Sequence, residues 1–190
     1  MAKIDYLVFG RKTVEVEGAG GAWTVLLCRG AHKNTLVLSI GDDVERLDVV
    51  LDEGADVIDR DDQGRAVRGG EVLDSRRMRA FALVCKRGDV RLVSVLHDAA
   101  RFKVQASSHD LSRERRVVES LAPGATAFVA WRSGKVRVRV SGEEDPFLPR
   151  ADEVVRIDAE RRALEFDVSG DGGFASIVVL TPRADDRREH

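Results

Sequence analysis

Basic and apolar residues alternate strictly over positions 135–140, Lys-Val-Arg-Val-Arg-Val. Successive side chains of a β-strand point to opposite faces, so this pattern places Val136, Val138 and Val140 on one face and the basic residues on the other. The segment therefore predicts a half-buried strand whose valines face a core.

Two other segments, 163–168 and 13–17, show the same alternation. Further runs are apolar on both faces, as expected of central strands that are covered on each side. These runs are 23–28, 81–85, 127–131 and 177–180. Turn signals rich in glycine and aspartate separate the strands at short intervals. The chain is therefore predicted to be all-β, an antiparallel β-sandwich that is jelly-roll-like in strand number, with a β-barrel as the alternative.

One short helix is expected near 111–121, because Leu111, Val117, Val118 and Leu121 fit a helical stripe and the other positions are largely charged. Pro123 follows shortly after and would stop it. The segment 46–51 fits both a helix and a strand, and we favour the strand.

Three hairpin-like stretches, 25–30, 82–88 and 128–134, share an apolar run, a basic residue and a glycine turn. Their spacing along the chain is unequal, which argues against a strict repeat. We interpret the likeness as the general pattern of hairpins.

The 190 residues are 43% hydrophobic and 34% charged, enough apolar material for a core with a charged surface. We predict a single β domain over 1–181 and a charged, flexible tail over 182–190. The net charge of −2 provides no overall field for nucleic acid or an anionic membrane. No apolar run is long enough for a signal peptide or a membrane span. The predicted location is the cytoplasm, or the inside of a particle, without classical secretion or membrane contact.

The sequence contains no recognised motif for catalysis or metal binding. The stretch 59–64 resembles the start of a calcium loop but lacks the later ligands. The spacing of Cys28, His32, Cys85 and His97 matches no known zinc site. No nucleophile elbow or phosphate-binding loop occurs. We therefore expect no catalytic residues, no metal and no cofactor, and both cysteines are expected to be buried and reduced.

A basic strand beside an aromatic residue is the most suggestive candidate for binding. It consists of Trp131, Arg132, Lys135, Arg137 and Arg139. Such a face could hold a phosphate backbone or an acidic sugar. The alternative is a charged edge strand that prevents edge-to-edge aggregation.

The leading functional prediction is a non-catalytic structural or interaction module, a subunit of a larger assembly or particle, that acts through a protein partner or self-assembly rather than as an enzyme. The first alternative is a module that binds carbohydrate, an acidic glycan or another polyanion, which would need exposed stacking platforms at Trp23, Trp131 or Tyr6. The second is a hydrolase or metal enzyme whose site is assembled only in the fold.

Overall fold

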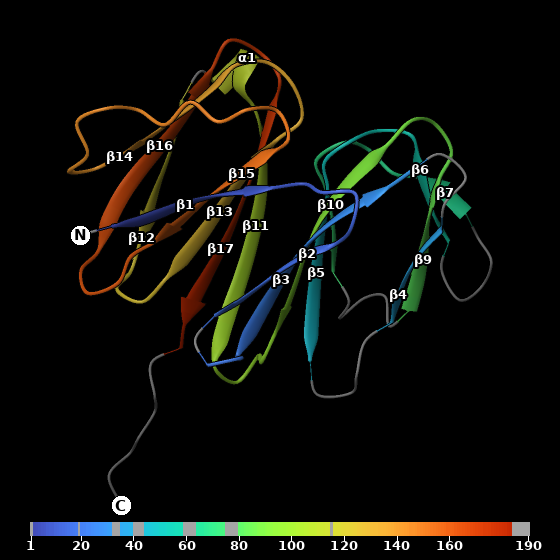
Figure 1. Ribbon diagram of the computed structural model, residues 1–190, viewed down its shortest axis with the longest axis horizontal. Helices are drawn as coiled ribbons and strands as arrows, with labels where there is room; N and C mark the ends of the chain where they lie inside the picture. Colours follow the sequence, from blue (N-terminus) through green and yellow to red (C-terminus); the bar gives the residue numbers. More distant parts are fainter. Residues whose placement is uncertain are drawn as a thin grey trace, which may run out of the picture.

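Four antiparallel sheets are stacked as layers in the described part of the chain (Figure 1). The computed structural model describes residues 2–18, 20–31, 35–39, 44–58, 64–74, 80–114 and 116–183. Two large inner sheets pack face to face, and a smaller outer sheet covers each of them. The outer sheets lie at the two sides of the view in Figure 1.

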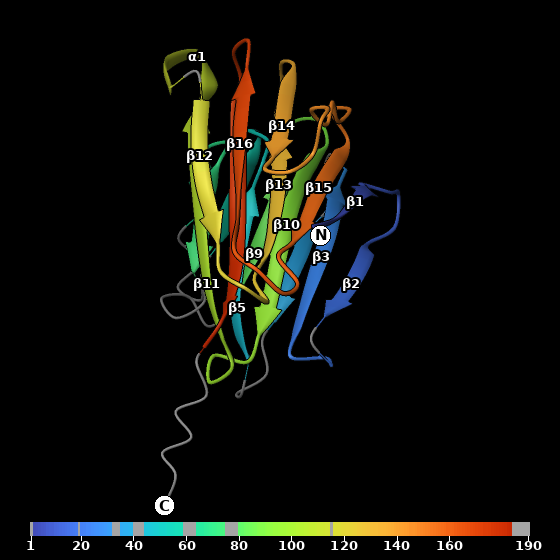
Figure 2. The ribbon, with the colours of Figure 1, turned by 90° about the vertical axis from the view of Figure 1, so that its left-hand side faces the viewer.

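The C-terminal half forms one inner and one outer sheet. The inner sheet has the order β1 (Lys3–Val8), β15 (Glu153–Asp158), β13 (Thr126–Trp131), β17 (Phe174–Pro182), β11 (Phe102–Asp110). The outer sheet has the order β12 (Arg116–Leu121), β16 (Leu164–Gly170), β14 (Val136–Val140). Figure 2 shows these three outer strands side by side.

The N-terminal half is built in the same way. Its inner sheet has the order β2 (Val14–Gly18), β3 (Trp23–Gly30), β10 (Val90–His97), β5 (Glu45–Val50), β8 (Glu71–Asp74). Its outer sheet has the order β4 (Thr35–Ser39), β9 (Ala80–Cys85), β6 (Ala55–Ile58), β7 (Gly64–Ala66). All strand pairs in both halves are antiparallel.

The two halves repeat one topology. The inner order β8-β5-β10-β3 matches β15-β13-β17-β11, and the outer order β4-β9-β6 matches β12-β16-β14, with the strands in the same succession along the chain. β1, β2 and β7 have no counterpart in this common plan. The structure is therefore a duplicated sandwich, which the hairpin likeness in the sequence did not identify.

Two equivalent turns show which residues of the two halves correspond to each other. The carboxylate of Glu71 accepts a hydrogen bond from the backbone N–H of Arg68 at 3.0 Å, just before β8. The carboxylate of Glu153 accepts one from the N–H of Arg150 at 2.7 Å, just before β15. An Arg-x-x-Glu-Val pattern is common to both turns, so it was the sequence signal for the repeat.

Apolar residues fill the three spaces between the sheets. One cluster lies inside the C-terminal sandwich, around Phe166 and Trp131. A second joins the two inner sheets and includes Trp23 packed edge to face on Phe128, with ring centroids 5.8 Å apart. A third lies inside the N-terminal sandwich, around Leu83. Because both inner sheets contribute to the middle cluster, each half covers one face of the other.

Arg91 of β10 ties the halves together at one end. Its guanidinium lies 2.7 Å from the carboxylate of Asp52 and donates to the backbone carbonyls of Ala151 and Arg132 in the C-terminal half. It also lies over the ring of Phe9. The ion pair and the carbonyl bonds together satisfy a largely buried cation.

The predicted strands are confirmed. Val136, Val138 and Val140 are at most 2% exposed and alternate with exposed arginines, as the pattern of β14 required. The ambiguous segment 46–51 is mostly the strand β5. The all-β antiparallel prediction therefore holds, in open sandwiches rather than the alternative closed barrel.

The helix predicted near 111–121 is confirmed only over its first four residues, α1 (Leu111–Glu114). Residues Arg116–Leu121 form β12, which pairs along its length with β16. Val117 and Leu121 point inward, and their spacing of four suits a strand as well as a helix. The pairing with β16 and the preference of β-branched valines for extended backbone favour the strand. As a consequence, Val118 is 53% exposed.

No helix in the described part of the chain is long and apolar enough to cross a membrane. The predicted tail, 182–190, begins in the last residue of β17, and its positions 184–190 lie outside the described residues.

Candidate functional site

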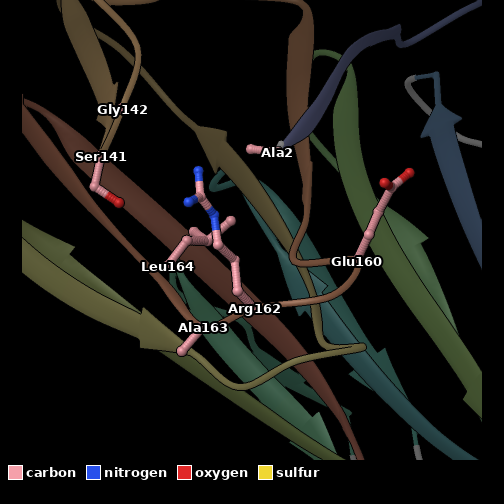
Figure 3. Close-up of a pocket in the computed structure, with 7 residues that line it drawn as sticks. All are labelled: Ala2, Ser141, Gly142, Glu160, Arg162, Ala163 and Leu164. Carbon is pink, nitrogen blue, oxygen red and sulfur yellow. The ribbon is translucent and has the colours of Figure 1, made fainter.

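A hollow of about 320 Å³ opens at one end of the C-terminal sandwich (Figure 3). Leu164, which belongs to the core cluster, and Ala2, which packs against it, form its apolar floor. Ser141, Gly142, Glu160, Arg162 and Ala163 complete the lining. We call this hollow the Arg162 pocket. Small-molecule sites are often found at the mouths of β-structures, with apolar walls and few polar groups.

Arg162 supplies the positive charge of this pocket. Its guanidinium lies between Ser141 and Ala2 in Figure 3, whereas the carboxylate of Glu160 points away from it. No hydrogen bond or ion pair of the Arg162 side chain is present among the described residues. Its fork of N–H donors is therefore available to an acceptor in the pocket.

Ser141 is held in place by the neighbouring strand. Its Oγ accepts a hydrogen bond from the N–H of Glu165 at 3.1 Å, and its own N–H donates to the carbonyl of Glu165 at 2.8 Å. The hydroxyl hydrogen remains to donate toward a ligand. A guanidinium, a fixed hydroxyl and an apolar floor together suit a small molecule with an acidic group and an apolar part.

The basic residues predicted from the sequence lie elsewhere and do not form one patch. Arg132 is partly buried, ion-paired with Glu53 at 2.8 Å, and its carbonyl accepts from Arg91. Lys135 and Arg137 line a separate hollow of about 570 Å³ at the other end of β14. Arg139 is exposed two positions further along the strand. Binding by these residues stays a prediction.

Trp131 does not join its basic neighbours at the surface. It is 1% exposed and packs inside the C-terminal sandwich. Trp23 is 3% exposed between the inner sheets, so neither indole offers a stacking platform. Tyr6 is 45% exposed and packs against Phe147 at one edge.

A buried polar cluster lies inside the N-terminal sandwich. The guanidinium of Arg46 donates to the carboxylate of Asp48 at 2.9 Å and to the hydroxyl of Ser94 at 2.8 Å, and Ser94 donates to Asp48. We call these three residues the inner network. All are at most 4% exposed. Sequence reasoning missed them, because β5 was considered only for its apolar residues.

Burial raises the pKa of Asp48, and the contacts with Arg46 and Ser94 oppose this effect. Because Asp48 and Ser94 are fully buried and bond to each other and to Arg46, a ligand would have to displace these contacts to use them. The inner network is therefore a structural cluster first.

Metal ligands do not gather in the described part of the chain: no group of three His, Cys, Asp or Glu side chains comes together there. These residues therefore offer no cluster of side chains that would fit a metal ion. Cys28 and Cys85 are free and buried in the N-terminal sandwich. Most of the calcium-like stretch, 59–63, and His32 lie outside the described residues.

No family model and no curated protein matches the sequence. Solved structures do match the fold. A conserved protein of unknown function from Pseudomonas aeruginosa PAO1 is 12% identical, with a TM-score of 0.71 over 97% of this chain and 100% of that one. HutD from Pseudomonas fluorescens SBW25 is 14% identical, with a TM-score of 0.65 over 96% and 100%. A cupin 2 conserved barrel domain protein from Leptotrichia buccalis is 14% identical, with a TM-score of 0.53 over 95% and 89%.

The similar structures also include an enzyme, a salicylate 1,2-dioxygenase mutant from Pseudoaminobacter salicylatoxidans, at 7% identity and a TM-score of 0.55 over 88% of this chain and 75% of that one. At such identities the likeness defines the fold alone. It nevertheless contradicts the prediction of a non-catalytic structural or interaction module and its carbohydrate or polyanion alternative, because these neighbours are of the cupin type and include an enzyme. The fold of this chain is a duplicated, cupin-like β-sandwich.

Proposed function

We propose that this protein binds a small organic acid in the Arg162 pocket. The observation that carries the proposal is the Arg162 guanidinium, which pairs with none of the described residues and lies above an apolar floor that is continuous with the core. A carboxylate would accept two parallel hydrogen bonds from the guanidinium fork. The apolar part of the ligand would rest on Leu164 and Ala2.

The cupin-like neighbours support a small ligand rather than a macromolecule, because the fold is shared with an enzyme that is named for a small aromatic acid. The volume of about 320 Å³ is at the lower end of ligand pockets. Molecules of a few to a dozen heavy atoms therefore suit it best.

The residues that line the Arg162 pocket favour binding of the acid without its chemical conversion. Proton transfer would need an acid or base within hydrogen-bond reach of the ligand. Glu160 is the one carboxylate in the lining, and it points away from Arg162. A carboxylate bound to Arg162 would thus meet donors but no general base from the pocket lining.

Three other expectations stay predictions alongside this proposal. A single domain over 1–181 is supported by the apolar cluster that the two halves share. A cytoplasmic location is consistent with the two free thiols. A protein partner or self-assembly has no feature among the described residues that singles it out.

The test is a calorimetric titration of the full chain with acetate, butyrate and benzoate. Affinity should rise along this series, because each added apolar group finds a place on the floor. Arg162→Ala should weaken butyrate binding by about tenfold or more, since a hydrogen bond to a charged group contributes about 1.5–3 kcal/mol. Arg162→Lys should recover only part of the loss, because an ammonium cannot form the paired bonds.

Arg161→Ala is the matched control, because Arg161 is the exposed neighbour in the same loop and does not line the pocket. It removes the same charge and should leave binding unchanged. If the two alanine variants lose the same affinity for butyrate, the loss reflects the overall charge of the protein, and the proposed binding at the Arg162 pocket is refuted. If NMR spectra show that the acid is consumed during incubation with the protein, the proposal of binding without turnover is wrong and the pocket is catalytic.

A further inference from the structure

A second hollow, of about 570 Å³, lies at the opposite end of the C-terminal outer sheet from the Arg162 pocket. Lys135 and Arg137 of the β14 segment line one side, Ser169 of β16 lies between the strands, and α1 and the turn 170–172 close the rim. Figure 2 shows α1 above this sheet. We call it the Lys135 pocket.

Two glycine turns give this pocket a fixed shape. Gly134 and Gly173 both adopt positive φ, +84° and +94°, and a Cβ on either would collide with the backbone of the other turn. The N–H of Asp171 donates to the carbonyl of Lys135 at 3.3 Å, and the N–H of Leu111 donates to the carbonyl of Gly173 at 3.0 Å. The backbone that carries Lys135 is thus held by its neighbours.

Positive charge in this pocket is left without an internal partner. Arg116, Ser169 and Arg137 lie opposite one another in a row across β12, β16 and β14. Arg116 is ion-paired with Asp167 at 3.1 Å. The side chains of Lys135 and Arg137 have no ion pair or hydrogen bond with any residue that the structure describes.

Two carboxylates lie nearby and limit the charge. Asp171 is an exposed residue of the rim. Asp110 accepts the hydroxyl hydrogen of Ser112 at 2.5 Å and lies 3.3 Å from Arg113, so it is already engaged. The lining itself keeps two cations against one anion.

The duplicated fold provides an internal comparison for this pocket. In the N-terminal half the backbone N–H of Lys86 donates to Gly54, as that of Asp171 donates to Lys135, so Lys86 is equivalent to Asp171. By the strand registers, Asp56 is equivalent to Arg137. The charges are reversed, and Lys86 lies 2.7 Å from Asp56 in an ion pair. The N-terminal pair neutralises itself, whereas Arg137 and Asp171 form no such pair.

We propose that the Lys135 pocket binds the phosphate group of a small phosphorylated molecule. Lys135, just before β14, and Arg137, two positions further along, supply charge on the same side of this segment, and the Ser169 hydroxyl lies beside Arg137 as a further donor. A tetrahedral dianion uses both cations, whereas a carboxylate carries half the charge. This proposal is independent of the Arg162 pocket, because the two hollows share no residue.

The experiment is a titration of the full chain with inorganic phosphate, phenyl phosphate and acetate at constant ionic strength, followed by calorimetry. Phosphate should bind saturably at millimolar concentration or below, and acetate at least tenfold more weakly through this pocket. Tighter binding of phenyl phosphate identifies a phosphate ester as the ligand, and equal binding identifies free phosphate. The combined variant K135A/R137A should lose phosphate binding, and Arg139→Ala, on the same strand outside the pocket, should retain it.

A charge-swapped variant separates arrangement from net charge. R137D/D171K rebuilds the self-neutralised pair of the N-terminal half without changing the charge of the protein. Phosphate binding should fall at least tenfold while the melting temperature stays within about 2 °C of wild type, as expected for surface substitutions. Retained binding in this variant, or in K135A/R137A, overturns the proposal, as does the absence of saturable phosphate binding to the wild-type chain. Loss of Arg162 leaves the results with inorganic phosphate unchanged, which distinguishes the two sites.

Discussion

The two sandwiches share a topology but not an interior. In the strand registers of the inner sheets, the N-terminal pair Asp48 and Ser94 occupies the place of Val129 and Ile177 in the C-terminal half. Arg46 corresponds likewise to Ala127. One half therefore seals its core with aliphatic side chains, and the other carries a charged network at the same positions.

This comparison indicates that the sandwich topology does not need the inner network. The C-terminal half reaches full burial at these positions with apolar residues alone. A buried ion pair contributes little net stability, because taking two charges out of water costs about as much as their attraction returns. The charged cluster is thus a property of the N-terminal half rather than a requirement of the fold.

The largest effect is expected when one charge is placed in the wrong half. Val129→Asp introduces the carboxylate of Asp48 without its guanidinium and hydroxyl partners. An unpaired buried carboxylate should lower the free energy of unfolding by about 4 kcal/mol or more. Urea denaturation followed by circular dichroism measures it. A loss below about 1 kcal/mol would mean that the C-terminal interior admits water.

Breaking the network from the other side should have the next largest effect. Arg46→Met leaves Asp48 buried without its cation, and the expected loss is about 3 kcal/mol. Adding Asp48→Asn to this variant removes the orphaned charge and should restore a good part of the loss. If the second substitution restores nothing, the packing of the Arg46 side chain, not its charge, explains the effect.

Replacing the network by aliphatic residues, as the C-terminal half has at these positions, should have a smaller effect of opposite sign. The variant R46L/D48V/S94I replaces all three residues of the inner network together, so none of the three loses its partner within the network while keeping its own polar group. We expect stability equal to wild type or higher, by up to about 2 kcal/mol. Thermal and urea unfolding should agree. A strong destabilisation would show that the network organises the N-terminal half and would end the equivalence of the two interiors.

The same variant should also change how stability depends on pH. The pKa of Asp48 is raised in the folded state, so its contribution to stability is greatest below its unfolded pKa, near about 4, and is lost as pH rises through the folded value. The difference in unfolding free energy between R46L/D48V/S94I and wild type should therefore grow as pH rises from about 4. A difference that is constant with pH would place the Asp48 pKa at its ordinary value.

The smallest effect concerns the thiols, which report on the N-terminal half alone. Burial raises the pKa of both Cys28 and Cys85, so alkylation at neutral pH should be slow in the native protein and complete after unfolding. In Arg46→Met the reaction of Cys28 should slow further, because Arg46 lowers the pKa of that thiol and its loss leaves the opposing effect of Asp48. Unchanged protection in this variant would separate the thiol from the network.

The strands could be predicted from residue patterns, since each half-buried strand carries its own period of two, as in β14 and β16. The duplication was harder to find, because the halves share strand order while their side chains have diverged. The prediction of a helix near 111–121 was mostly wrong, because the segment that pairs with Arg116–Leu121, β16, lies far away in the sequence. Arg162 and Ser141 lie far apart in sequence, and only the closure of the sandwich brings them to one pocket.

The first strand of the chain has a consequence for the order of folding. β1 is made before the other described strands, yet its partner β15 follows most of them along the chain. The strand next to it in sequence, β2, can pair with β3 at once. Contacts between distant segments form slowly because a long loop must close. The N-terminal half can therefore be assembled during synthesis. Residues 3–8, which are partly apolar, remain unpaired until β15 of the C-terminal inner sheet has been made.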